Sequence, residues 1–244
     1  MNDALVMIVS LLALGQLSAR LGWFPENAAE TLNRFVIYVS LPALVLSLTP
    51  SLRFSASLGL LVITPWIVLV AGALLVTLFA RVQRIAPDTK AALLLCVPLG
   101  NTSFLGFPMV SALFGEHAVR YALVLDQFGS FMILSTYGLW VIARYSDGPA
   151  PTLRSVAKRM LTFPPFIALA TGLICFQGLG LTAPAPLQTL FSRVGSTLVP
   201  LAMFAVGLRM QLRLPKPLLP FVFGVSTKLV VLPAIAALVL RALG

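Results

Sequence analysis

The sequence predicts an all-α membrane protein with about eight transmembrane helices. Of the 244 residues, 59% are hydrophobic and only 10% are charged, and the mean hydropathy is +1.00. Apolar segments of about 20 residues, enough to cross a bilayer, follow one another with short polar connections, and an internal repeat relates the two ends of the chain. A hydropathy window of about 19 residues places the spans near residues 4 to 21, 32 to 49, 58 to 80, 90 to 114, 119 to 143, 161 to 178, 190 to 208 and 218 to 241.

The basic residues predict the orientation of these spans. The formal net charge of +10 does not indicate a nucleic-acid partner, because Lys and Arg are scattered singly between the apolar segments. Twelve of the 17 follow odd-numbered spans, four follow even-numbered spans, and Lys228 lies inside a span. Since basic residues accumulate on the cytoplasmic side, we expect a multi-pass protein of the cytoplasmic (inner) membrane with its N-terminus outside.

The first predicted span is expected to stay in the mature protein. No basic region precedes it and no small-residue cleavage site follows it, which distinguishes it from a signal peptide. The second and seventh spans contain Pro42 and Pro200, which we expect to kink helices that brace a moving part. A tolerated membrane proline with no further role is the alternative for both.

The fourth predicted span is interrupted by the stretch from Pro98 to Pro108, which contains two prolines, two glycines and three adjacent polar residues. Proline removes a backbone donor and clashes with the preceding turn, while Gly100 and Gly106 permit dihedral angles that other residues resist. Unpaired backbone at membrane depth is tolerated only where protein or a water-filled cavity satisfies it. Broken helices of this kind mark substrate sites in secondary transporters, so this stretch is the predicted site.

Asn101, Thr102, Ser103, Gly106 and Pro108 are the predicted substrate-binding residues. An amide side chain donates to a carboxylate and accepts from an exposed backbone N–H, which suits the gap between two half-helices. The second half-helix is expected to begin around residues 103 to 108, where proline fits a first turn and the N-terminal end attracts anions. A small organic anion is therefore the predicted ligand. The alternative is that these polar residues only satisfy the kink and bond a neighbouring helix.

Asp126 and Lys228 are the two charges well within predicted spans. A charge at the bilayer centre costs about 3 kcal/mol even on lenient scales, so each is expected to face protein or water. Asp126, followed by Gln127, is a candidate site for a coupled proton or cation, unless it lies near enough to the outer end of its span to be hydrated. Lys228 is expected either to balance an anionic substrate or to neutralise Asp126 as a charge pair.

An internal repeat divides the chain after the fifth span. Gly15 precedes Pro42 by 27 residues, Gly172 precedes Pro200 by 28, and in both copies an Arg lies seven or eight residues before the proline. Since five spans, an odd number, separate the copies, they are inserted with opposite orientation and form an inverted repeat.

The predicted domains follow from this repeat. They are a first five-helix repeat at residues 1–145, a cytoplasmic basic loop at 146–160, and a second repeat at 161–244. At the same offset, the partner of the broken stretch falls near residues 256 to 266. The second repeat is therefore predicted to be incomplete, with three helices.

An enzyme is not expected. The sequence contains one His and neither a Gly-x-Ser-x-Gly motif nor a P-loop. Cys96 and Cys175 lie far apart inside apolar segments, as small buried hydrophobic residues do. We therefore predict neither a cofactor nor a metal site.

Two segments resemble a known family. They are Gly-Asn-Thr-Ser-Phe-Leu-Gly-Phe-Pro followed by Val-Leu-Asp-Gln-Phe-Gly-Ser-Phe, and Leu-Asn-Arg-Phe-Val-Ile-Tyr-Val-Ser-Leu-Pro-Ala near the start. Both are similar to the auxin efflux carrier family, in its bacterial malate and malonate permease-like branch, and the likeness covers essentially the whole chain. The resemblance implies a secondary carrier for organic anions. Its fold, shared with bile acid symporters, would have two inverted repeats of five helices, with helices four and nine broken and crossing at the substrate site.

Carried over by motif, Asn101 and Pro108 belong to the first crossover. The resemblance assigns spans three to five and eight to a mobile domain, and spans one, two, six and seven to a scaffold. Helices nine and ten of the family have no counterpart in these 244 residues, so the expected arrangement here is five helices and three.

These observations together predict a secondary active transporter in the lipid bilayer. It would move a small mono- or dicarboxylate by alternating access around the broken helix, coupled to protons or sodium, with a homodimer as one arrangement left open. The alternatives are a membrane sensor that binds without transport and a truncated, inactive carrier.

Overall fold

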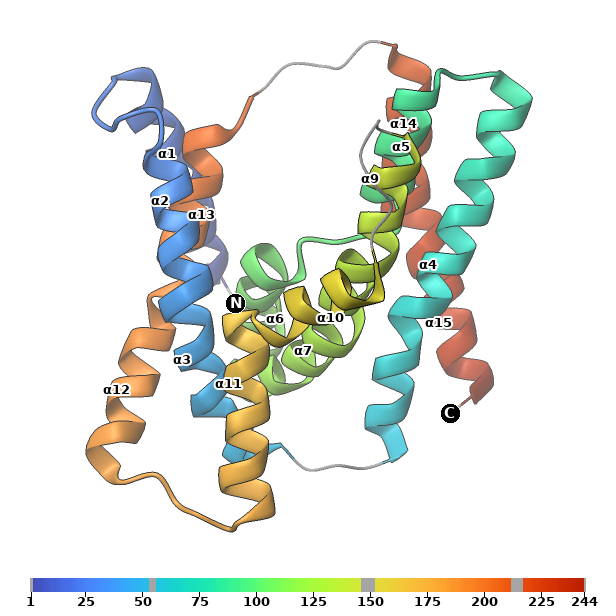
Figure 1. The fold of residues 1–244 in the computed structure, drawn as a ribbon. Coiled ribbons are helices and arrows are strands. Elements are labelled where there is room, and N and C mark those ends of the chain that lie inside the picture. Colours follow the sequence, from blue (N-terminus) through green and yellow to red (C-terminus); the bar gives the residue numbers. More distant parts are fainter. Residues whose placement is uncertain (1, 53–55, 146–151, 212–216, 244) are drawn as a thin grey trace. The chain divides into compact units, whose positions relative to one another are not determined.

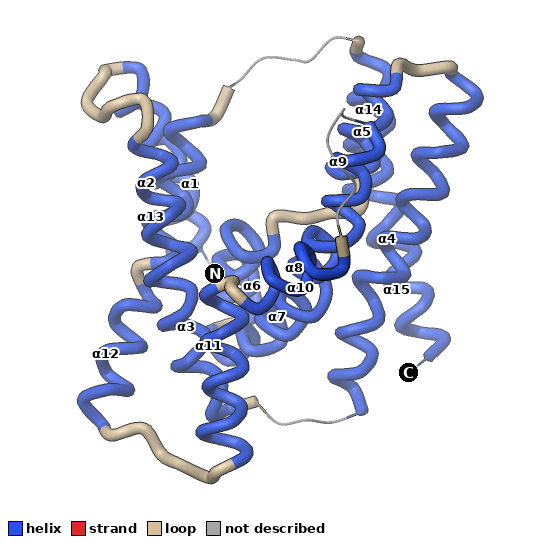
Figure 2. Tube along the Cα trace, viewed as in Figure 1, coloured by secondary structure: helices blue, strands red, loops and turns tan. Residues whose placement is uncertain are grey.

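The computed structural model describes residues 2–52, 56–145, 152–211 and 217–243 (Figure 1). Within these ranges the chain consists of helices and connecting turns, with no strand (Figure 2), so the all-α prediction is confirmed. Helices occur at all eight predicted segments. The described helices that are long and apolar enough to cross a membrane number five, or up to six if a bent pair counts as one span. These five are Ala28–Ser51, Gly59–Gln83, Glu116–Tyr145, Ala185–Arg209 and Leu218–Ala242.

The chain divides into two compact units. Unit 1 comprises Met1–Arg53, Asn101–Leu123 and Leu161–Leu212, and unit 2 comprises the intervening segments and the C-terminal one. Unit 1 therefore contains the predicted spans one, two, six and seven, and unit 2 contains spans three and eight with most of span five. This matches the grouping of spans that the resemblance implied, with one exception. Asn101–Leu123, which holds the second half of span four and the start of span five, belongs to unit 1.

Unit 1 is built from closely packed pairs of helices. Its α-helices are α1 (Asn2–Arg20), α2 (Ala28–Phe35), α3 (Leu41–Leu48), α6 (Phe107–Phe114), α11 (Pro164–Gly172), α12 (Ala185–Ser196) and α13 (Leu198–Arg209). Helices α1 and α13 lie side by side (Figure 1) with Gly15 against Gly207, where an added Cβ on either would overlap backbone of the other helix. Small residues at membrane helix contacts permit this approach.

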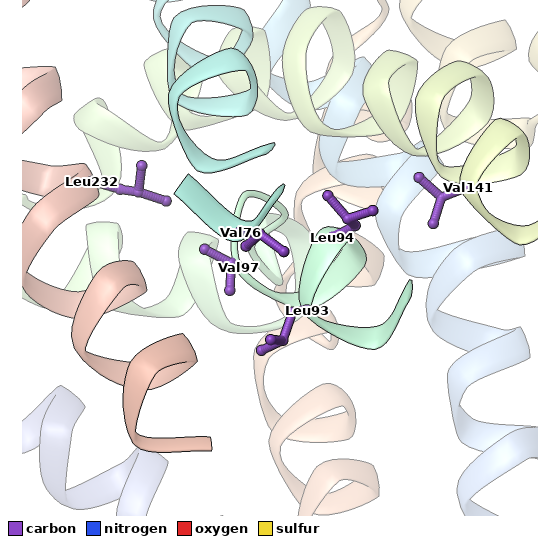
Figure 3. Packing of buried hydrophobic residues seen from close by; sticks show 6 residues of the cluster. All are labelled: Val76, Leu93, Leu94, Val97, Val141 and Leu232. Atoms are coloured by element: carbon purple, nitrogen blue, oxygen red, sulfur yellow. The ribbon is translucent and has the colours of Figure 1, made fainter. Parts of the chain in front are cut away.

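Unit 2 packs its helices around one apolar core. Its α-helices are α4 (Ala56–Gln83), α5 (Pro87–Cys96), α8 (Phe131–Ile133), α9 (Leu139–Tyr145), α10 (Leu153–Leu161, which ends at the unit boundary), α14 (Leu218–Ser226) and α15 (Leu232–Leu243). Helix α7 (Val119–Leu125) crosses from unit 1 into unit 2. Figure 3 shows the buried cluster of Val76, Leu93, Leu94, Val97, Val141 and Leu232. Three other helices, α4, α9 and α15, thus hold α5, the first half of the broken span, in place.

The predicted basic loop at residues 146–160 contains a helix. Residues 146–151 lie outside the described residues, but α10 begins at Leu153. Apolar residues at 153, 156 and 160 recur at helical spacing, with Arg154, Lys158 and Arg159 between them. Such a pattern is typical of an amphipathic helix. The sequence predicted a polar connection here because the residues of this helix are highly charged.

Helix α4 exposes a continuous apolar stripe. Val70, Leu74, Leu78 and Val82 recur every four residues and are 58 to 68% exposed. Residues at this spacing share one helix face. A contiguous apolar face of this kind requires an apolar environment, which lipid provides for a multi-pass protein.

Candidate functional site

The predicted break in the fourth span is present. Helix α5 ends at Cys96, residues 97–101 are not helical, and a second helix runs from Thr102 to Phe114. Pro98 has no N–H to offer the carbonyl of Leu94, four residues earlier. The Tyr137 hydroxyl donates to that carbonyl oxygen instead, at 3.3 Å. A tyrosine in another span thus replaces the backbone donor that the proline removed.

Lys228 satisfies further carbonyl groups at the same end of the break. It lies in a π-helical segment, Thr227–Val231, between α14 and α15. Its Nζ donates to the carbonyl oxygen of Cys96 at 2.7 Å and to that of Leu99 at 2.6 Å. A cation is favourable at a helix C-terminus, where the last carbonyls lack intrahelical partners. Lys228 therefore caps α5, while its charge pair with Asp126 stays a prediction.

Asn101 caps the start of the second half-helix. Its φ and ψ of −86° and 74° are not helical, and its Oδ1 accepts from the N–H of Phe104 at 3.1 Å. Its own carbonyl accepts from the N–H of Gly106 at 3.0 Å. The amide thus accepts from a backbone donor that the break exposes, while its role in substrate binding stays a prediction. Thr102 and Ser103 form the first turn after it, and both are partly buried.

Pro108 is the second residue of α6, in the first turn where proline was expected, and it is buried. It lines a cavity of about 730 Å³ within unit 1, beside Ser111 and Glu116. Helices α3, α12 and α13 supply much of the remaining wall, including Pro200. Asn101, Thr102, Ser103 and Gly106 are not among the described residues that line this cavity. The structure thus separates Pro108 from the capping residues of the break.

Asp126 and Gln127 form a buried polar pair in unit 2. They are 3% and 0% exposed, and Nε2 of Gln127 donates to Oδ2 of Asp126 at 2.9 Å. In the described part of the chain, Oε1 of Gln127 is buried without a hydrogen-bond partner. Asp126 is therefore buried within the described structure, and its role as a coupling site stays a prediction.

The predicted kink prolines both follow a helix irregularity. A π-helical segment, Val36–Ser40, precedes Pro42 in α3, and Thr197 interrupts the helix just before Pro200 in α13. Proline cannot donate in a regular helix, so the preceding turn widens or breaks. Whether these helices brace a moving part stays a prediction.

Sequence reasoning missed two side chains that complete helix ends. Tyr137 is one, and Gln177 is the other: its Nε2 donates to the carbonyls of Thr49 at 3.2 Å and Leu52 at 3.0 Å, where α3 gives way to the loop. A lone amide or phenol in an apolar segment is the only sequence signal. It does not identify carbonyl partners that are 43 or more residues away.

A polytopic helical protein whose span is broken, with both new ends capped by polar side chains, has the architecture of a membrane transporter. The sequence comparisons agree. The chain belongs to the membrane transport protein family, which is the auxin efflux carrier family, and the family model matches residues 2–244. The family resemblance found in the sequence is therefore confirmed.

Three similar proteins align with most of the chain. An uncharacterized transporter of Methanocaldococcus jannaschii is 31% identical over 218 residues, which are 86% of this chain and 68% of the relative. An uncharacterized transporter of Methanothermobacter thermautotrophicus is 29% identical over 87% of this chain and 68% of its own. A protein of Rhizobium meliloti named as a candidate malonate transporter is 30% identical over 94% of this chain and 73% of its own. All three are similar proteins described as transporters.

Proposed function

We propose that this protein is a secondary active transporter that moves a small mono- or dicarboxylate across the cytoplasmic membrane. The observation that supports this best is the interruption at residues 97–101, because both helix ends created there are completed by polar side chains. A break that served only as a kink would not require a partly buried lysine from a span 132 residues away. The name of the Rhizobium meliloti relative suggests malonate as the first substrate to test.

Each side of the interruption favours negative charge. The helix from Thr102 to Phe114 begins at the break, and a helix N-terminus presents backbone donors and a partial positive charge. Lys228 brings a full positive charge to the other side. Two carbonyl oxygens stabilise this ammonium without neutralising it. A carboxylate is the natural ligand of such a break.

Transport requires coupling and movement, and both are parts of the proposal. The buried carboxylate of Asp126, next to Gln127, is the proposed site for a coupled proton or sodium ion. The two units are the groups of helices whose relative movement would alternate access. The distribution of Lys and Arg supports an N-terminus outside and a basic connection at residues 146–160 in the cytoplasm.

Contacts inside unit 1 support the proposed inverted repeat. The hydroxyls of Ser40 and Thr197 hydrogen-bond at 2.7 Å, and these residues are 157 apart in the chain. The same offset relates Gly15 to Gly172. Equivalent residues of two repeats meet in this way on a pseudo-two-fold axis, where a transporter's repeats join.

A second contact recurs with the two repeats exchanged. Gly15 packs against Gly207, and Gly172 packs against Thr49, whose Oγ1 would lie 2.8 Å from an added Cβ. Thr49 and Gly207 are themselves 158 residues apart. The first helix of each repeat therefore packs through a glycine on the second helix of the other. This reciprocity is what an inverted repeat predicts.

The proposal is tested by reconstituting the purified protein in liposomes and following uptake of radiolabelled malonate. A pH or sodium gradient is imposed in separate experiments. We expect gradient-dependent uptake that unlabelled malonate and related small carboxylates inhibit. Saturable malonate binding without uptake under any gradient would contradict transport and favour a membrane sensor. The absence of both would contradict the proposed substrate class.

A further inference from the structure

Another cavity, of about 530 Å³, lies within unit 2, where α4 ends, α5 begins and α9 ends. Each of these segments contributes one cation to its lining: Arg81, Lys90 and Arg144. They are far apart in sequence, so the fold brings them together. Nothing in the proposed transport mechanism uses this cavity.

The turn between α4 and α5 shapes one wall. Arg84 adopts a φ of 48°, in the left-handed region where a helix often ends. The chain then reverses through Ile85 to Pro87, which opens α5, and both residues line the cavity. This tight reversal returns Lys90 to the side of Arg81.

An aromatic ring joins the other two cations. The Nζ of Lys90 and the guanidinium carbon of Arg144 each lie 5.8 Å from the centre of the Tyr145 ring. Cation–π contacts at this distance hold both side chains over the ring. Lys90 and Arg144 are thereby positioned beside the cavity.

The cavity carries an excess of positive charge. None of the described residues that line it is acidic. Three converging cations favour an anion with several acceptor oxygens. A phosphate group fits, because guanidinium groups bind its oxygens in a fork and lysine adds a point charge.

The position of the cavity indicates where this phosphate comes from. Two candidate membrane spans, Gly59–Gln83 and Glu116–Tyr145, end at its rim. Tyrosine is typical of the level of lipid headgroups, and basic pockets at span ends bind acidic headgroups. We propose that Arg81, Lys90 and Arg144 bind the phosphate of an anionic phospholipid.

Native mass spectrometry of the purified full chain tests this proposal, with phosphatidylglycerol and phosphatidylcholine of identical acyl chains as probes. We expect phosphatidylglycerol to bind more tightly. The double variant Lys90→Gln/Arg144→Gln should lose about 25-fold in that affinity, at about fivefold for each cation near a membrane surface. Its phosphatidylcholine binding should not change. The matched control, Arg193→Gln/Arg241→Gln, removes the same charge outside this cavity and should keep wild-type affinity for phosphatidylglycerol.

Two results would overturn the proposal. One is equal affinity for the two lipids, and the other is an equal loss in the control variant. Inorganic phosphate is titrated separately. Binding of inorganic phosphate that depends on Lys90 and Arg144, without retention of phosphatidylglycerol, would assign the site to a soluble phosphate and contradict a lipid ligand. A matching melting temperature of each variant and the wild type shows that the site, and not the fold, was changed.

Discussion

Lys228 and Tyr137 complete the backbone hydrogen bonds that the break at Pro98 leaves unmade. Together they satisfy the carbonyl oxygens of Leu94, Cys96 and Leu99. An unpaired carbonyl at membrane depth costs several kcal/mol, because lipid offers no donor. These two side chains therefore let a helix end in the middle of a membrane span.

Replacing Lys228 tests this capping role directly. Lys228→Met keeps the length of the side chain but removes the donors to two carbonyl oxygens. We expect a loss of about 2 to 3 kcal/mol in the free energy of unfolding, since hydrogen bonds from charged groups contribute this much. Tyr137→Phe removes one neutral bond and should cost about 1 kcal/mol. Chemical denaturation in detergent measures both, and Lys228→Met as stable as the wild type would contradict the role.

A charge swap separates capping from the alternative charge pair. In Asp126→Lys/Lys228→Asp, a carboxylate would face the carbonyl oxygens of Cys96 and Leu99. If capping is the main role of Lys228, the swap cannot restore the function lost in the single variants. Restored malonate uptake would instead favour the charge pair between Asp126 and Lys228.

Residue chemistry allowed part of the site to be predicted. Asn101 follows a proline and a glycine in the same span, so its capping role depends on local sequence alone and could be predicted. The partners of Lys228 could not, because they depend on which span packs beside α5. The same is true of Tyr137, which is 43 residues from its acceptor.

At the scale of elements, close backbone contact fixes how the helices of unit 1 pair. Gly15 on α1 and Gly207 on α13 face each other, and Gly195 on α12 lies against Leu44 of α3, whose Cα would be 2.9 Å from an added Cβ. Side chains at these positions would separate the helices. In a membrane, such packing replaces much of the hydrophobic driving force.

Gly15→Ala should destabilise the protein, since its methyl group would overlap the carbonyl oxygen of Phe204. Overpacking of this kind costs about 1 to 3 kcal/mol. Gly59→Ala in α4 is the matched control: an added Cβ there meets nothing within 4 Å, and alanine is favoured over glycine in helices by about 1 kcal/mol. Thermal unfolding in detergent should show a lower midpoint temperature than the wild type for Gly15→Ala only. Equal midpoints would contradict the packing argument.

The positions of the helices could be predicted where the segments are long and almost wholly apolar. All eight apolar segments are helical, because their length and hydropathy leave few alternatives. The helix from Leu153 to Leu161 was not predicted, since its charge resembles that of a loop. The π-helical segments, such as Asp126–Ser130, were also missed. They depend on packing, as where Gly129 accommodates Pro65 of α4.

On the scale of the whole molecule, the division into units coincides with the break. The first segment of unit 2 ends at Gly100, and the second segment of unit 1 begins at Asn101. The chain therefore passes from one unit to the other within the interruption. Family resemblance predicted the grouping of spans, but composition alone could not, because all spans are similarly apolar.

The central claim is that this break binds a carboxylate, and malonate uptake by Asn101 variants tests it most directly. Asn101→Asp keeps an oxygen that caps the second half-helix, because Asp and Asn are equivalent N-caps, but it adds a negative charge. The account predicts wild-type folding stability and at least about a tenfold loss of uptake, since even about 1.4 kcal/mol of like-charge repulsion is sufficient. Asn101→Ala should lose about 1 kcal/mol of stability with the cap and should also lower uptake. Malonate uptake at the wild-type rate by folded Asn101→Asp protein would contradict a carboxylate site at the break.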